Sequence, residues 1–198
     1  MLDFLGFVLL LALVGMLAAY LTRTTAIRRV RPLGIEEHAL DARAERFNLY
    51  LELLTSTHIV GGNRIELLFD GDGTFPRIWD DLSRAEQAIC VHVYEFQPGR
   101  VADELLRILS ERAQTGVRVL LLLDAVGSGQ MPRDYRERLT AAGASVATYR
   151  PLTFRTLYKY QQRMHMRAIV IDGRVGFTGG FGIADHWQGN GRAPDQWR

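Results

Sequence analysis

The sequence predicts an α/β domain, in which helices pack on a parallel or mixed β-sheet. Two observations indicate this class. From Arg64 onward, short apolar runs of strand length alternate with segments whose apolar residues recur at helical spacing. One of these runs, 117–123, is apolar at every position except Arg118, which is typical of a strand covered on both faces. Such alternation favours a layered domain over an all-helical or all-strand fold.

The elements follow in a regular order from Ile65. Strands are expected at 65–69, 89–96, 117–123 and 145–148, and a last strand carries His165 and Arg167. Helices are expected at 74–88, 101–115 and 133–142. The first of these helices has Thr74 as its cap and Pro76 in its first turn. Gly116 and Gly143 end the other two, because glycine readily takes the left-handed conformation at a helix end.

The N-terminal segment is an uncharged apolar run from Phe4 to Leu21. About 18 apolar residues suffice to suggest a membrane-spanning helix, so the sequence predicts a transmembrane anchor over residues 1–22. Arginines follow the run, which favours a single pass through the cell's inner (cytoplasmic) membrane with the catalytic part in the cytoplasm. The alternatives are a buried core helix and a cleaved signal peptide, which would carry basic residues before a shorter apolar core.

Two further regions follow the anchor. Residues 23–62 read as a juxtamembrane helical linker, and residues 63–198 read as the catalytic domain. Within the linker, an amphipathic helix is expected over 36–54. Its expected apolar stripe consists of Leu40, Phe47, Tyr50, Leu51 and Leu54.

Composition excludes several classes of function. Lys and Arg number 24 against 22 Asp and Glu, and this balance argues against a dedicated nucleic-acid-binding protein. Cys90 is the only cysteine, so neither a disulfide framework nor a cysteine-rich metal site can form within the chain. No histidine has the spacing of a known metal-ligand motif. The sequence therefore predicts neither a metal nor a cofactor.

The segment with the clearest chemical content begins at His165. Side chains alternate along a strand, so His165 and Arg167 are expected on the same face. Asp172-Gly173 then predicts a hairpin. A nucleophile or acid–base group beside a permanent cation suits chemistry on a phosphate ester. A strand histidine with a purely structural role is the alternative.

These residues resemble the active-site motif of cardiolipin synthases in the phospholipase D superfamily. Members carry His-x-Lys-x4-Asp followed by a glycine-rich turn, and here His165, Arg167, Asp172 and Gly179-Gly180 match it. Further similarity lies at 65–71, 93–96, 116–124 and 182–187. The resemblance implies a phospholipase D-like layered sheet with flanking helices. It departs from the family at two positions, with Arg167 in place of lysine and Gly182 in place of a frequent asparagine.

The resemblance also implies a function. Such a membrane-bound enzyme transfers a phosphatidyl group between phosphatidylglycerol molecules through a phosphohistidine intermediate, without a metal. His165 would be one catalytic histidine, Arg167 a phosphate clamp, and Asp172 a residue that orients a histidine or fixes the turn. Gly179, Gly180 and Tyr94 would bind substrate. A second half-site, from a missing C-terminal region or a homodimer partner, would supply the other histidine.

Two alternatives stay open for the activity. One is a phospholipase D-type phosphodiesterase that uses water as the acceptor, and the other is an inactive truncated half-enzyme. Two other histidines have less specific interpretations. His92 is expected to pack inside the domain, and His186 either lines the pocket or faces solvent.

Overall fold

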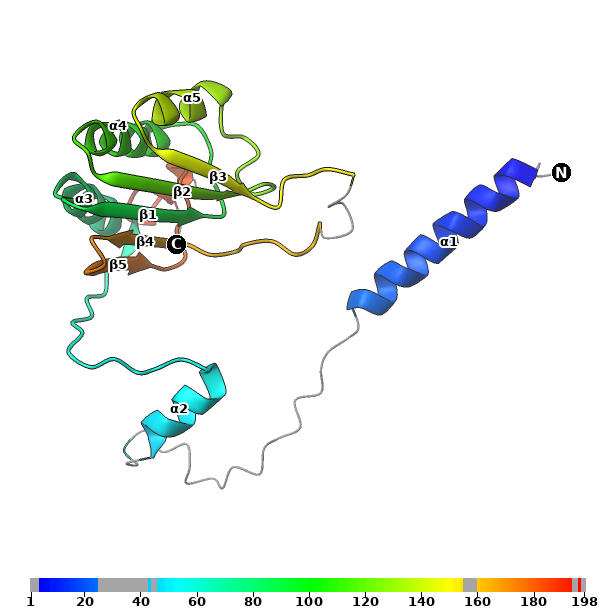
Figure 1. The fold of residues 1–198 in the computed structure, drawn as a ribbon, viewed down its shortest axis with the longest axis horizontal. Coiled ribbons are helices and arrows are strands. Elements are labelled where there is room, and N and C mark those ends of the chain that lie inside the picture. Colours follow the sequence, from blue (N-terminus) through cyan, green and yellow to red (C-terminus); the bar gives the residue numbers. More distant parts are fainter. Residues whose placement is uncertain (1–3, 25–42, 44–45, 155–159, 194–195, 197–198) are drawn as a thin grey trace. The chain divides into compact units, whose positions relative to one another are not determined.

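The computed structural model describes residues 4–24, 43, 46–154, 160–193 and 196, and the side chains of 21–24 lie outside this description. The chain divides into two compact units, Met1–Ile65 and Glu66–Arg198. Figure 1 shows both units in the colours of the sequence, and each is described by itself.

The first unit contains helices α1 (Phe4–Thr24) and α2 (Phe47–Thr55). The large apolar side chains described in α1 are exposed, Phe4 at 85% and Leu17 at 55%. Crossing a bilayer takes about 20 mostly apolar residues in one helix. No helix in the described parts of the chain is both long and apolar enough to do so. The transmembrane helix predicted over residues 1–22 is therefore not supported, although a helix forms there.

Helix α2 occupies the second part of the amphipathic helix predicted over 36–54. None of its residues is buried. Its stripe residues Phe47, Tyr50 and Leu51 are partly or fully exposed, and Leu40 lies outside the described residues.

The second unit contains a five-stranded sheet with the order β3-β2-β1-β4-β5. The strands are β1 (Ala88–Val93), β2 (Arg118–Asp124), β3 (Ser145–Tyr149), β4 (Ala168–Ile171) and β5 (Val175–Thr178). β1, β2 and β3 are parallel, whereas β4 runs antiparallel to both β1 and β5. The predicted α/β class with a mixed sheet is confirmed.

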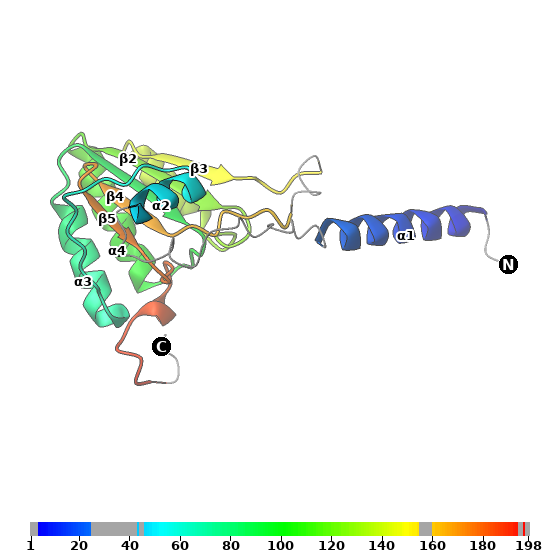
Figure 2. The ribbon, with the colours of Figure 1, turned by 90° about the horizontal axis from the view of Figure 1, so that it is seen from below.

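Helices α3 (Asp70–Ser83), α4 (Arg100–Gln114) and α5 (Arg133–Ala141) pack side by side over one face of this sheet (Figures 1 and 2). Their apolar sides and alternate strand residues form the core, including Ile78, Leu82, Ile89, Val91, Leu105, Leu109, Leu121 and Ile169. The strand residues that point to the other face of the sheet are more exposed, with Leu120 48% exposed and Val170 41% exposed. The expectation that 117–123 is covered on both faces is wrong for the described part of the chain, because the helices there lie on one side.

The start of α3 differs from the prediction. Residues 65–69 form no strand, and the helix begins at Asp70 instead of Thr74. Asp70 Oδ1 accepts a hydrogen bond from Gly73 N–H at 2.9 Å. The N–H groups of Gly71 and Asp72 donate to the carbonyl of Gly189 at 2.9 and 3.1 Å. An acceptor far along the chain thus satisfies the donors of the first turn, which local turn signals alone could not reveal.

The hairpin at Asp172-Gly173 is confirmed. Both residues have positive φ, at 53° and 64°, and Arg174 N–H donates to Ile171 O at 3.0 Å. Positive φ at both central positions is the signature of a type I′ turn, whose twist matches that of the flanking strands. Ile171 lies opposite Val175, so three residues, 172–174, connect β4 to β5.

Candidate active site

His165 and Arg167 lie in the extended segment just before β4, instead of within the strand as predicted. Ala168, the first residue of β4, pairs with His92 near the end of β1. Both residues are therefore at the carboxyl edge of the three parallel strands. In open α/β sheets, this is the edge at which ligands usually bind.

The His165 imidazole is exposed and contacts two side chains. The ring of Tyr94 meets it edge-on, with centroids 4.2 Å apart and planes at 88°. Arg167 Nη2 lies 3.4 Å from His165 Nε2. The imidazole and the guanidinium are therefore direct neighbours. The predicted neighbourhood of His165 and Arg167 is present, and Tyr94 belongs to it.

In the described part of the chain, no carboxylate pairs with the Arg167 guanidinium. Among the described residues, the ion pairs use other arginines. The Nε atom of Arg167 is buried and has no hydrogen-bond acceptor. The Cζ atom lies 5.9 Å from the centre of the Trp187 ring. The site therefore contains a cation whose charge is not neutralised by its neighbours.

A small, open hollow adjoins this cation. It is lined by His92, Val93, Arg167, Ala168, Ile169, Phe181, Gly182 and Ile183. A buried donor without an acceptor is rare in folded proteins and calls for an explanation. An anion bound beside Arg167 would supply the missing acceptor.

Asp124, at the end of β2, links the segment that carries His165 to the loop that follows β2. It is fully buried. Oδ2 accepts from Met164 N–H at 2.9 Å, directly before His165. Oδ1 accepts from the N–H groups of Val126 and Gly127 at 2.9 and 3.2 Å. A single carboxylate therefore joins the segment before His165 to the loop after β2.

The loop after Asp124 in turn holds Tyr94. Ser128 Oγ donates to Tyr94 O at 2.7 Å. A Cβ atom at Gly127 would collide with the same carbonyl, so only glycine fits there. The backbone under the Tyr94 ring is therefore fixed from the neighbouring strand.

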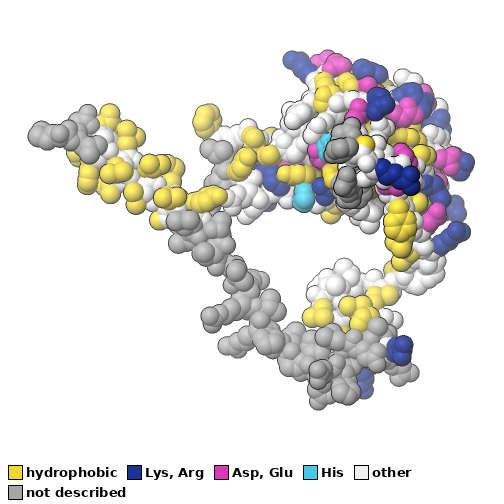
Figure 3. Space-filling view, turned by 180° about the vertical axis from the view of Figure 1, so that it is seen from behind, with side chains coloured by type: hydrophobic (Ala, Val, Ile, Leu, Met, Phe, Trp, Pro, Cys, Tyr) yellow, Lys and Arg dark blue, Asp and Glu magenta, His cyan; other side chains and the backbone are white. Residues whose placement is uncertain are grey.

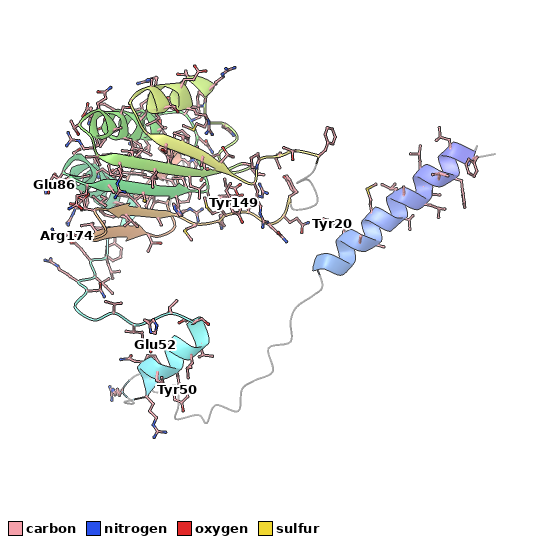
Figure 4. All side chains as sticks on the ribbon, in the orientation of Figure 1. Tyr20, Tyr50, Glu52, Glu86, Tyr149 and Arg174 are labelled. Atoms are coloured by element: carbon pink, nitrogen blue, oxygen red, sulfur yellow. The ribbon has the colours of Figure 1, made fainter. Side chains whose placement is uncertain are left out.

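Asp172 lies at the opposite end of β4. Its carboxylate accepts from the N–H groups of Ala88, Gln87 and Glu86 at 2.8, 2.8 and 2.9 Å. Those three bonds, Ala88 first, lower the pKa of Asp172 below its usual value, and Arg174 adds a smaller effect. Figure 4 shows Glu86 and Arg174 at one end of the sheet and Tyr149 at the other. Of the two expected roles for Asp172, this geometry matches fixing the turn.

The glycine-rich turn follows β5 and is exposed at Gly179 and Gly180. Thr178 Oγ1, just before it, donates to Arg167 O at 3.0 Å. A Cβ atom at Gly179 would lie 3.6 Å from Phe181, which is an ordinary contact. Protein packing therefore does not require glycine at 179, whereas close approach of a ligand to the backbone would.

The close packing around position 182 explains why glycine stands there. A Cβ atom there would lie 2.8 Å from both Glu95 Oε2 and Trp187 Nε1. Those two atoms form a hydrogen bond of 2.9 Å. The family asparagine would not fit against this pair without a shift.

The other histidines contact neighbours outside the His165–Arg167 pair. His92 is half-buried, lies 3.3 Å from Met166 Sδ through its Nδ1 atom, and lines the hollow beside Arg167 instead of packing inside the domain. His186 is exposed and lies 3.5 Å from Glu95 Oε1. Within the described residues, no cluster of three or more His, Cys, Asp or Glu could hold a metal ion.

Sequence reasoning missed three residues: Asp124, Glu95 and Trp187. A signal existed for Asp124, because a carboxylate directly after a buried apolar run and before a glycine-rich loop marks the carboxyl edge of a strand. Glu95 and Trp187 are far apart in the sequence, and no local pattern connects them.

Charge on the folded unit is mixed. Figure 3 shows basic and acidic side chains interspersed over the visible face. That face has no large area of one sign, in keeping with the nearly balanced composition.

Comparison with known proteins identifies relatives of the chain. The family described as "Cardiolipin synthase, PLD-like domain" matches residues 78–187. The cardiolipin synthase of Geobacillus kaustophilus is 38% identical over 169 residues, which cover 84% of this chain and 34% of the relative. Cardiolipin synthase A of Pseudomonas fluorescens is 29% identical over 166 residues, 82% of this chain and 35% of the relative. The chain thus spans about a third of the length of these relatives.

Among solved structures, the phospholipase D family member Nuc from Salmonella typhimurium is similar. The match covers 60% of this chain and 69% of that one, with 16% identity and a TM-score of 0.45.

Proposed function

The chain belongs to the cardiolipin synthase family of phospholipase D-like domains, and we propose that it carries a half-site for phosphatidyl transfer between phosphatidylglycerol molecules. The observation that carries this proposal is the pair formed by His165 and Arg167, with 3.4 Å between Nε2 and Nη2. It places an imidazole nitrogen directly beside a guanidinium that pairs with no carboxylate among the described residues.

In the first step, His165 attacks the phosphorus of one phosphatidylglycerol. An N–P bond forms, the P–O bond to the headgroup glycerol breaks, and glycerol leaves with a proton from a second histidine. In the second step, a hydroxyl of another phosphatidylglycerol attacks the phosphohistidine and gives its proton to that second histidine. Cardiolipin is released, and His165 is restored.

Arg167 stabilises the phosphoryl oxygens in both steps. Its donors can bind two of those oxygens, and a fixed cation acts most strongly on charge that develops in the transition state. The backbone at Gly179 and Gly180 offers an exposed surface near the same site. Tyr94 holds the imidazole by its ring edge.

The second histidine comes from another half-site, in a further part of a longer polypeptide or in a second copy of this chain. A two-fold pairing would bring two His165–Arg167 pairs to one site. The substrates are lipids, so we place the reaction at a membrane surface. Exposed apolar side chains of α1, such as Phe4 and Leu17, support attachment to that surface.

The test uses the full chain with vesicles of phosphatidylglycerol that is labelled in its phosphate and in its headgroup glycerol. We expect labelled cardiolipin, free glycerol and an acid-labile phosphohistidine that maps to His165. The His165→Gln variant should form none of these. His58→Gln is the matched control, since the His58 side chain is 95% exposed in the first unit.

Each product has a distinct meaning. Phosphatidic acid in place of cardiolipin would assign the chain to the hydrolytic alternative. Absence of any product and of phosphohistidine would overturn transfer by two paired copies of this chain and leave the inactive half-enzyme.

A further inference from the structure

The long side chain of Arg167 needs a neighbour that fixes its position. A guanidinium on a long side chain must be held in place to act on a phosphate, and a carboxylate partner would hold it only by neutralising it. Among the described residues, no such ion pair forms. The group that lies against Arg167 is the Trp187 indole, 5.9 Å from Cζ to the ring centre. An aromatic face attracts a cation and leaves its charge and its in-plane donors available.

The indole itself is fixed at its polar end by Glu95. Trp187 Nε1 donates to Glu95 Oε2 at 2.9 Å. The second oxygen of Glu95 accepts from Gln97 Nε2 at 2.8 Å. Since Gly182 has no side chain, the Glu95–Trp187 pair can lie directly against its backbone.

The backbone of Trp187 is fixed as well. It belongs to the short 3₁₀ helix η3 (Asp185–Trp187), and its N–H donates to Ala184 O at 3.2 Å. A Cβ atom at Gly71 would collide with the Trp187 carbonyl, so this segment lies tightly on the start of α3. The carbonyl oxygen of Gly189 also accepts a hydrogen bond from Gly71 N–H at 2.9 Å, which holds this segment on the start of α3. The indole is thus held from its ring and from its backbone.

We propose that Trp187, oriented by Glu95, is a positioning residue that holds Arg167 over the phosphate site with its charge intact. This inference rests on the proposed function, in which Arg167 binds the phosphoryl group. It also accounts for arginine at a position where the family has lysine. A broad planar cation can lie flat on an indole, whereas an ammonium makes a smaller contact.

The test measures the affinity of the full chain for inorganic phosphate by calorimetry, which requires no turnover. Trp187→Leu should weaken binding about fivefold, the size of a partly desolvated cation–π contact. Trp187→Phe keeps an aromatic face and should restore most of the affinity. Trp79→Leu is the matched control, because Trp79 stacks on Phe75 at 5.5 Å in another part of the core. Melting temperatures of all variants show whether each remains folded.

The affinities decide the outcome. The inference is overturned if Trp187→Leu keeps the wild-type affinity, if it loses no more than Trp79→Leu, if Trp187→Phe is as weak as Trp187→Leu, or if the wild-type chain binds no phosphate. Failure of the proposed function has a different signature. In that case the phosphate affinities follow the expected order, while no cardiolipin forms from phosphatidylglycerol.

Discussion

The two ends of β4 differ in how their polar groups are satisfied. At the Asp172 end, the carboxylate accepts three backbone N–H groups and fixes the hairpin to the start of β1. At the His165 end, an exposed imidazole lies beside a cation with a buried, unpaired Nε. One short motif therefore combines an end built for stability with an end left open for a ligand. Substitutions at the two ends should separate activity from stability.

The largest effect is expected at the open end. His165→Gln removes the proposed nucleophile and should lower the transfer rate by roughly 10⁴-fold or more. Its melting temperature should stay close to that of the wild type, because the side chain is exposed. Vesicle assays and thermal unfolding measure the two quantities. A folded variant that keeps a tenth of the activity would refute a nucleophilic role.

Arg167→Gln should have the second-largest effect. We expect kcat/KM to fall about 10²- to 10³-fold, because the substitution removes a donor to the charge that develops in the transition state. Arg174→Gln is the matched control, since Arg174 lies in the hairpin at the other end of β4. Equal losses for the two variants would show that Arg167 contributes only general positive charge.

Asp124→Ala tests the anchor that links the loops of the open end. It leaves the N–H groups of Met164 and Val126 without their acceptor. We expect unfolding by denaturant to show a loss of about 3 kcal/mol. Asp80→Ala is the control, because Asp80 forms only an exposed pair with Arg84 and should cost less than about 1 kcal/mol. A similar small loss for Asp124 would contradict its role as an anchor.

Asp172→Asn should have the smallest effect on turnover and a stability effect that depends on pH. The folded pKa of Asp172 lies below its usual value of 3.8. The ionised carboxylate therefore stabilises the fold fully above pH 3.8, and this contribution is lost as pH falls through the lower folded pKa. Melting curves of both proteins should differ at neutral pH and converge in strong acid. A gap that stays constant down to strong acid would exclude the proposed cause.

The sequence predicted the features that depend on local pattern. Alternation of apolar residues located β1, β2 and β3, and Asp172-Gly173 predicted the hairpin, because the chemistry of each lies within a few residues. The start of α3 could not be predicted, since its first N–H groups bond to Gly189. The Glu95–Trp187 pair was missed for the same reason. The His-x-Arg spacing correctly predicted that His165 and Arg167 are neighbours. The structural role of Asp172 could not be predicted in the same way, because it depends on hydrogen bonds from the distant residues 86–88.

The bonds from Gly71 and Asp72 to Gly189 also constrain the order of folding. During synthesis the chain emerges from its N-terminus, so α3 leaves the ribosome long before its first turn can find this acceptor. A contact between residues so far apart in the sequence forms late, because bringing them together costs the entropy of closing a long loop. Trp187 sits next to Gly189, and the same closure brings its indole to Arg167. The contact between Trp187 and Arg167 can therefore form only after the segment around residue 189 has been synthesised and has bound the start of α3.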